Sequence, residues 1–230
     1  MNKKVQDMLI GAILGDAHIS RTGVNKAFIS FEQSKKKSEY LNYLQNLTKE
    51  AGIPLQDERV KEYSREDLRY NTTNKSVYFR TESVEELKPL AEMFLDKENK
   101  KIIPSNISDL LTPRGLAFWI MDDGQQVKRG GLTLCTDSYS TNEVNILREA
   151  LKKNFNLETT IHTKKGKDEA VYERIYLKKE EFEALKPEIV PHMHDSMLYK
   201  INEQITIKQD SSDIESDSSE MMDIFDIGGS

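Results

Sequence analysis

The sequence is poor in the residues that build zinc and redox sites. It contains a single cysteine, Cys135, and only four histidines among 230 residues. One cysteine excludes an internal disulfide and a cysteine-based zinc site, and it favours a reducing compartment. No apolar run approaches the roughly 20 residues that a membrane-spanning helix needs, and the N-terminal residues lack a small-residue cleavage site. We therefore expect one large or two small domains, without a membrane partner or a secretion signal.

A strong charge of one sign is also missing, although the charge is unevenly distributed. The formal net charge is −6, from 33 basic and 39 acidic residues. All 33 basic residues lie within residues 1–208, whereas seven acids lie within residues 209–230, so the body carries a net charge of +1. A nearly neutral body is compatible with a nucleic acid partner if its basic residues gather on one face. The Ser- and Asp-rich residues 209–230 are predicted to form an acidic, disordered tail.

Two similar segments, about a hundred residues apart, indicate an internal duplication. Residues 8–17 read MLIGAILGDA and residues 116–124 read LAFWIMDDG. Each is an apolar run that ends in an acid, and superposing Asp16 on Asp123 gives an offset of 107 residues. Because only two copies are present, the pattern predicts two pseudo-symmetric halves rather than a solenoid.

The segments that follow each run also match. Helical spacing and capping residues predict helices over residues 38–51 and 140–151. Alternation predicts strands over 56–62 and 76–81 in the first half, and over 158–164 and 170–177 in the second. Acid-started helices over 84–95 and 179–190 close the halves, and the prolines at 89 and 187 predict a kink or an early end.

These elements predict an α+β fold of two αββαββα repeats. We divide the chain into a first repeat at residues 1–96, a linker at 97–112, a second repeat at 113–208 and the tail at 209–230.

The small residues of the first run indicate how the two acids meet. Gly11 and Gly15 lie four residues apart and share one helical face, which a second helix can approach closely. If the second run is that partner, the two helices form the interface between the repeats, and Asp16 and Asp123 emerge side by side. Adjacent carboxylates repel unless a cation lies between them. Oxygen ligands without cysteine favour a hard ion such as Mg²⁺, which can activate water for phosphodiester hydrolysis.

Two further residues precede the acids at equivalent positions. Gly15 and Asp122 are additional candidate metal ligands, Asp122 through its backbone carbonyl. The side chain of Asp122 has no counterpart in the first repeat, where Gly15 stands.

The two runs resemble the paired motifs of single-chain LAGLIDADG homing endonucleases, especially the intron-encoded branch with a Gly-Asp-Ala first motif and a Met-Asp-Asp-Gly second motif. The resemblance covers about residues 5–205 and includes NKKIIP at 99–104, LTP at 111–113 and MLYK at 197–200. Phe118 and Trp119 depart from it, because they are bulky where the motif is small, so helix packing is expected to differ in detail.

The resemblance implies a function and roles for individual residues. It implies site-specific, Mg²⁺-dependent cleavage of both strands at a long asymmetric DNA target by a monomer. Asp16 and Asp123 would be the catalytic metal ligands, and Lys101 and Lys200 would stabilise the transition-state phosphate or position the water. The family precedent favours an organelle-encoded, mitochondrial product, with nuclear, chloroplast and bacterial origins left open.

Double-stranded DNA would bind to the antiparallel strands of the two repeats, which would form a saddle with alternate side chains facing the groove. Most such contacts position the phosphates and few specify bases. The run Lys35 to Lys37 is interpreted as a helix-start surface or a phosphate contact. The candidate DNA-binding residues are Lys26, Gln33, Arg59, Lys61, Arg69, Arg80, Lys128, Arg129, Thr136, His162, Lys164 and Arg174.

Two alternatives stay open. Relatives of these enzymes assist the splicing of their host intron, so an RNA maturase with intron RNA as its partner is one. A DNA-binding regulator that does not cut, with the acidic tail as a protein-interaction segment, is the other.

Overall fold

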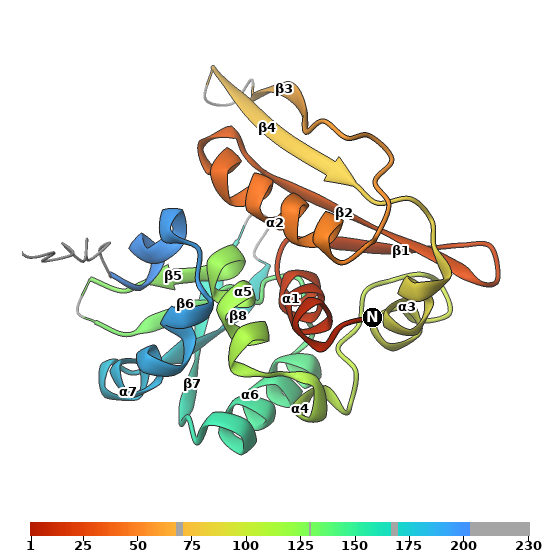
Figure 1. Ribbon diagram of the computed structural model, residues 1–230. Helices are drawn as coiled ribbons and strands as arrows, with labels where there is room; N and C mark the ends of the chain where they lie inside the picture. The colour runs from red at the N-terminus through yellow and green to blue at the C-terminus, as the bar shows by residue number, and fades with distance from the viewer. Residues whose placement is uncertain (68–70, 129, 167–169, 203–230) are drawn as a thin grey trace, which may run out of the picture.

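The computed structural model describes residues 1–67, 71–128, 130–166 and 170–202, and it has the α+β architecture predicted from the sequence (Figure 1). The first repeat consists of α1 (Lys3–Leu14), β1 (His18–Thr22), β2 (Lys26–Ser34), α2 (Ser38–Glu50), β3 (Lys61–Asp67), β4 (Thr72–Arg80) and α3 (Lys88–Phe94). The second consists of α5 (Pro113–Asp123), β5 (Gly124–Gln126), β6 (Leu132–Leu134), α6 (Thr141–Phe155), β7 (Thr159–Lys165), β8 (Val171–Leu177) and α7 (Lys179–Ile189). The short helix α4 (Ile107–Leu110) lies between them.

The described residues also contain the short 3₁₀ segments η1 (Lys35–Lys37), η2 (Glu85–Leu87), η4 (Val190–His192) and η5 (Asp195–Ile201). The predicted division at residues 96, 113 and 208 stays our interpretation. The predicted tail at 209–230 lies outside the described residues. No helix in the described part of the chain is long and apolar enough to cross a membrane.

Each repeat builds one four-stranded antiparallel sheet with the same strand order. The orders are β1-β2-β4-β3 and β5-β6-β8-β7, so the topology repeats as the sequence predicts. The sheets occupy the upper and lower left parts of the molecule in Figure 1, with α1 and α5 between them. In β2, Ala27, Ile29 and Phe31 are buried and alternate with more exposed residues, so one face packs on the core and the other meets solvent.

Most predicted elements appear within a few residues of their expected bounds, but one strand does not. The predicted strand at 56–62 is wrong, since β3 begins only at Lys61. The carboxylate of Asp57 accepts a hydrogen bond from the backbone N–H of Arg59 at 3.0 Å, and this local turn keeps the segment from extending.

The two prolines take different positions. Pro89 lies in the first turn of α3, where its missing N–H leaves no helical hydrogen bond unmade, and the predicted helix at 84–95 is instead a 3₁₀ turn followed by α3. Pro187 lies inside α7, which ends two residues later at Ile189.

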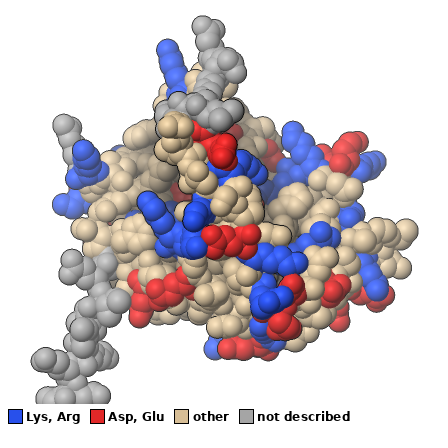
Figure 2. All heavy atoms as spheres, turned by 90° about the horizontal axis from the view of Figure 1, so that it is seen from above, with Lys and Arg blue, Asp and Glu red and all other residues tan. Residues whose placement is uncertain are grey.

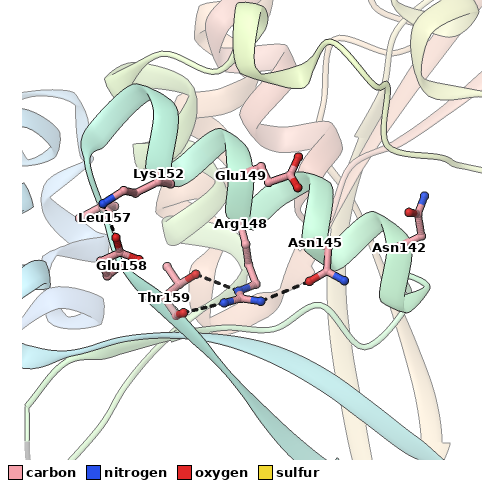
Figure 3. Close-up of a pocket in the computed structure, with 8 residues that line it drawn as sticks. All are labelled: Asn142, Asn145, Arg148, Glu149, Lys152, Leu157, Glu158 and Thr159. Carbon is pink, nitrogen blue, oxygen red and sulfur yellow. Dashed lines mark hydrogen bonds and ion pairs between the residues drawn. The ribbon is translucent and has the colours of Figure 1, made fainter.

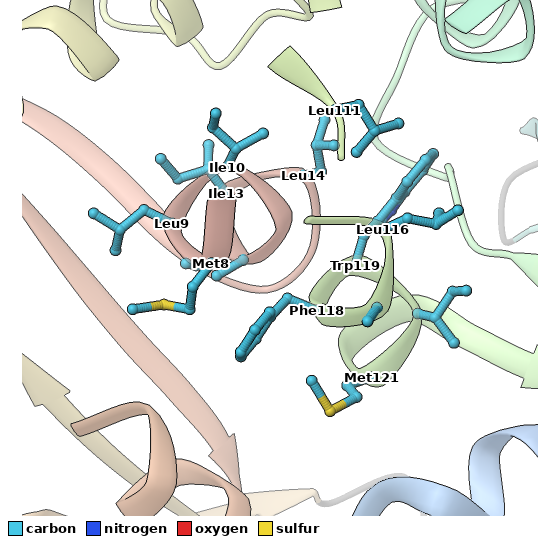
Figure 4. Close-up of a cluster of buried hydrophobic side chains, with 14 of the residues drawn as sticks. Met8, Leu9, Ile10, Ile13, Leu14, Leu111, Leu116, Phe118, Trp119 and Met121 are labelled. Carbon is cyan, nitrogen blue, oxygen red and sulfur yellow. The ribbon is translucent and has the colours of Figure 1, made fainter. Parts of the chain in front are cut away.

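The helices α1 and α5 pack backbone to backbone at the centre of the molecule. A Cβ atom added to Gly11 would lie 2.1 Å from the carbonyl oxygen of Gly115. Figure 4, which views both helices end on, shows Leu9, Ile10 and Ile13 pointing from α1 away from α5. The large side chains thus fill the core on either side while glycine lies at the contact.

The bulky residues of the second run are accommodated without separating the helices. Gly115, one turn before Phe118, provides the close approach in α5. The Phe118 ring stacks near Tyr43 of α2, with 6.2 Å between ring centroids, and Trp119 is fully buried. The sequence analysis did not single out Gly115, because it lies outside the segment that repeats.

We expect Gly11→Ala to lower the free energy of unfolding by about 1–3 kcal/mol, because overpacking this contact exceeds the gain of about 1 kcal/mol in helix propensity. Urea unfolding measures the change. Gly115→Ala is the matched control: its added Cβ would lie 3.2 Å from the carbonyl oxygen of Asp7, so its loss should be clearly smaller. Equal stability of Gly11→Ala and the unmodified protein would contradict the close contact.

Candidate active site between the repeats

The carboxyl ends of α1 and α5 bring acids from the two repeats together. The backbone N–H of Asp16 donates to the Asp122 carboxylate at 3.3 Å, across 106 residues of sequence. The side-chain amide of Gln33, on β2, donates to Asp16 Oδ2 at 2.9 Å and to Asp122 Oδ1 at 3.0 Å. One amide group therefore bridges carboxylates from both halves of the chain.

The side chain of Asp122 is buried and has a structural role. Its side chain is 6% exposed and fills the space beside Gly15, where an added Cβ would lie 2.5 Å from Asp122 Cβ. Burial raises the pKa of Asp122 well above its ordinary value, and the charges of Asp16 and Asp123 raise it further. The Asp122 carboxyl thus fits the gap left by glycine in the other repeat and anchors the backbone of Asp16.

Asp123 is less deeply enclosed and remains close to Asp16. Burial is the main cause that raises the pKa of Asp123 to about 7, and the charge of Asp16 is the second. The ammonium groups of Lys101, Lys200 and Lys37 oppose this shift.

Lys101 and Lys200 bind the ends of the two central helices. The Lys101 ammonium donates to the carbonyls of Ile13 at 2.7 Å and Gly15 at 3.1 Å. The Lys200 ammonium donates to those of Asp122 at 3.0 Å and Gly124 at 2.9 Å. Cations at helix carboxyl ends are favourable, because the last carbonyls have no partners within the helix.

Burial lowers the pKa of both lysines, against the pull of the neighbouring acids. The two lysines therefore lie within the electrostatic field of the acids, as the resemblance implied. The carbonyls of Gly15 and Asp122, predicted as metal ligands, each accept a hydrogen bond from one of these ammonium groups.

The structure adds residues that the sequence analysis did not place in the site. The Tyr40 hydroxyl, buried in α2, lies next to Asp122; burial first, and the charge of Asp122 second, raises the pKa of Tyr40. Lys37 acts electrostatically on Asp122, Asp123 and Lys200. Tyr139 donates from its hydroxyl to the carbonyl of Leu14 at 2.8 Å. No spacing rule connects these positions to the motif acids, so the sequence carried no signal for them.

A polar groove opens beside Asp16, at the end of β2 and the start of β4. It contains two cations, Lys37 and Lys75, and two acids, Asp16 and Glu32. The groove is lined by Asp16, Glu32, Gln33, Ser34, Lys37, Asn74, Lys75 and Ser76.

A second hollow lies elsewhere, between α6 and the start of β7 (Figure 3). Its Arg148 is held by Thr159 and Asn145, and its Lys152 pairs with Glu158. Arg148 and Lys152 therefore already have partners within the hollow, and we assign no ligand to it.

Comparison with known proteins agrees with this arrangement. Residues 6–185 match the family described as the LAGLIDADG DNA endonuclease family. The chain belongs to this family. It is 32% identical over 209 residues to the cytochrome b mRNA maturase bI2 of Saccharomyces cerevisiae, a match that spans 87% of this chain but only 48% of the maturase. It is also 28% identical to the DNA endonuclease I-ChuI of Chlamydomonas applanata, over 88% of this chain and 96% of that protein.

A solved structure has the same fold. The homing endonuclease I-WcaI, bound to its DNA recognition sequence, aligns with a TM-score of 0.75 and 26% sequence identity, over 87% of this chain and 86% of that one. The prediction of LAGLIDADG membership and of its fold is therefore confirmed.

The motif acids of this LAGLIDADG chain offer carboxylate oxygens, which are the type of ligand that a hard cation prefers. Among the residues that the structure describes, no group of three or more His, Cys, Asp or Glu side chains could hold a metal ion. An ion held by Asp16 and Asp123 would therefore take its remaining ligands from water, backbone or nucleic acid oxygen atoms.

Several predicted DNA-binding residues share the solvent faces of the two sheets. Strand pairing places Arg80 and Lys61 on one face of the first sheet, since Arg80 is opposite Ser30 and Lys61 is opposite Tyr78. In the second sheet, His162 is paired with Arg174, and Lys164 lies two residues from His162 on the same face. Lys26, Arg59 and Lys128 are exposed at strand ends or in loops.

Some of these side chains already have partners. The Arg80 guanidinium lies 3.4 Å from the centre of the Phe28 ring, the His162 ring stacks on Tyr176, and Arg174 pairs with Asp137. In the view from above in Figure 2, Lys and Arg side chains lie among Asp and Glu. DNA would have to replace part of this internal pairing.

Two predicted DNA contacts are buried. Thr136 is fully buried, and its hydroxyl donates to the carbonyl of Glu173 at 2.5 Å, so its assignment as a DNA contact is wrong. Gln33 is also buried, because it shares the core-facing side of β2 with Ile29 and Phe31, and it binds the acids instead. Arg69 and Arg129 lie outside the described residues.

The raised pKa of Asp123 predicts a pH dependence of stability. Because the folded protein holds this proton more tightly than the unfolded chain, the stabilisation is present below about pH 4 and is lost as the pH rises through about 7. Without divalent cations, Asp123→Asn should therefore be more stable than the unmodified protein at about pH 8, with a smaller difference at about pH 5. Thermal unfolding at both pH values measures this. Asp109→Asn, an exposed site on α4, is the control, and an Asp123→Asn variant less stable at pH 8 would contradict the assignment.

Proposed function

We propose that this protein is a site-specific endonuclease that breaks both strands of a long, asymmetric DNA target by hydrolysing phosphodiester bonds. The proposal rests on the meeting of Asp16 and Asp123 with Lys101 and Lys200 between two sheets whose solvent faces carry basic side chains. Two repeats in one chain supply two such halves, so we propose that a monomer acts. The DNA complex of the related I-WcaI supports a duplex as the partner.

We propose Mg²⁺ as the cation, held by Asp16 and Asp123. When bound, it would lower the pKa of a water molecule and neutralise charge on the scissile phosphate. The repulsion between the acids, which Lys101, Lys200 and Lys37 offset in part, favours a cation between them.

The protein's own groups have separate tasks in this proposal. Gln33 holds one oxygen of Asp16 and so orients the other. Lys101 and Lys200, fixed at the carboxyl ends of α1 and α5, both place positive charge near the acids, and each would stabilise the phosphate of one strand. The sheets would hold the duplex through phosphate contacts, with alternate side chains facing the groove.

Asp16→Asn or Asp123→Asn should abolish double-strand cleavage and leave DNA affinity within about twofold, because each substitution removes a metal-binding charge without changing the DNA-facing strands. The target is first recovered by selecting cleaved molecules from a randomised duplex library with Mg²⁺ present and absent. Cleavage assays and gel-shift titrations on that target then test the variants. Asp109→Asn should cut normally, and cleavage by either motif variant at the unmodified rate would refute the proposal.

We propose RNA splicing assistance as a second candidate function, because the yeast relative at 32% identity is named as an mRNA maturase. In that case the protein would bind a group I intron, and the aspartates would be dispensable. The same Asp16→Asn and Asp123→Asn variants should then support splicing of the host intron in vitro at the unmodified rate. Loss of splicing in both would argue against a function independent of the acids. Since cytochrome b messages are made in mitochondria, we propose that location for this protein.

A further inference from the structure

Lys101 is held from the first repeat although it lies in the linker. A β-bridge joins Lys101 to Leu95 just after α3, and the ammonium reaches the carbonyls of Ile13 and Gly15 at the end of α1. An ammonium group has three donors and a flexible stem, so these contacts by themselves leave it able to move to other carbonyls nearby.

Tyr139 of the second repeat restricts this movement of the Lys101 ammonium. Its hydroxyl donates to the carbonyl of Leu14 at 2.8 Å, which lies between the two carbonyls that Lys101 uses. The Lys101 ammonium is 5.8 Å from the centre of the Tyr139 ring, within the range of a cation–π contact. Without the hydroxyl, the free Leu14 carbonyl would compete for the ammonium.

The same segment also holds the chain beyond Lys101. Glu143 accepts with Oε1 from the backbone N–H of Ile103 at 3.1 Å, and with Oε2 from the backbone N–H and hydroxyl of Ser140. The cap of α6 is thus joined to the linker two residues after Lys101. From the second repeat, Tyr139 thus acts on the ammonium group of Lys101, and Glu143 holds the backbone that follows this lysine.

The described part of the first repeat has no tyrosine at the equivalent position. Tyr139 stands two residues before α6, and the residue two before α2 is Lys36, which is exposed. Lys200 lies on η5 of its own repeat and contacts the end of α5. The contacts of Tyr139 and Glu143 therefore hold Lys101 and not Lys200.

We propose that Tyr139 is a positioning residue that holds Lys101 against the end of α1, so that the second repeat controls the position of a basic residue that is carried by the linker. The inference rests on the proposed endonuclease function. It predicts that Tyr139 matters for the strand served by Lys101 and not for the other strand.

The test is single-turnover cleavage of the selected target, with each strand labelled separately. Lys101→Met identifies the strand that depends on Lys101. Tyr139→Phe, which keeps the ring, should slow that same strand by about 2- to 10-fold, the rate equivalent of one neutral hydrogen bond, with DNA affinity unchanged. The double variant should be no slower than Lys101→Met alone, because Tyr139 acts through Lys101.

Two further variants guard against a purely structural effect. Tyr43→Phe removes a hydroxyl from another partly buried tyrosine beside a central helix and should leave both strands unaffected. Glu143→Ala removes the acceptor of the Ile103 N–H and should slow cleavage of the same strand as Tyr139→Phe does. If one of the two variants folds poorly, the other still tests the proposal.

The outcomes separate the two levels of the proposal. Equal slowing of both strands, multiplying effects in the double variant, or cleavage by Tyr139→Phe at the unmodified rate would each overturn the positioning role while the endonuclease function stands. Failure of the unmodified protein to cut any DNA would overturn the proposed function and the positioning role together.

Discussion

The contact between α1 and α5 is the constraint on which the rest of the structure depends. Because Gly11 contacts Gly115 backbone to backbone, the carboxyl ends of α1 and α5 lie close together, and so do Asp16 and Asp123, which lie at these ends. A larger residue at Gly11 would move the helices apart and separate Asp16 from Asp123. Burial first, and the charge of the neighbouring acids second, raises the pKa values of Asp122 and Asp123. Lys101, Lys200 and the Gln33 amide offset part of the repulsion between these acids.

The repeats are similar in topology but not in the chemistry of the site. Gln33, near the end of β2, bridges two acids, whereas Thr136, shortly after β6, donates to a backbone carbonyl. Lys37 precedes α2, whereas Ser140 caps α6. A duplicated fold with unequal halves suits a target whose two half-sites differ in sequence, because each half can then evolve its own contacts.

The sequence was sufficient wherever local spacing or a repeated pattern carries the information. The offset between Asp16 and Asp123 predicted two equivalent halves, and the Ser140 to Glu143 capping box marked the start of α6. Prediction failed where a single side chain changes the local backbone, as Asp57 does before β3. It also failed where packing decides burial: Gln33 lies on the core-facing side of β2, and Thr136 is buried just after β6, although the sequence predicted both as DNA contacts.

Family membership, the two-repeat α+β plan and the identity of the motif acids were thus determined by the sequence alone, because they depend on order and spacing along the chain. The resemblance also indicated Lys101 and Lys200, but the other partners of those acids were decided only by the tertiary structure. Tyr139, Gln33 and Lys37 come from a loop, a strand and a 3₁₀ turn, and no periodicity links them. They meet because two helices pack closely enough for both repeats to reach the same helix ends, and such long-range proximity leaves no mark in local sequence.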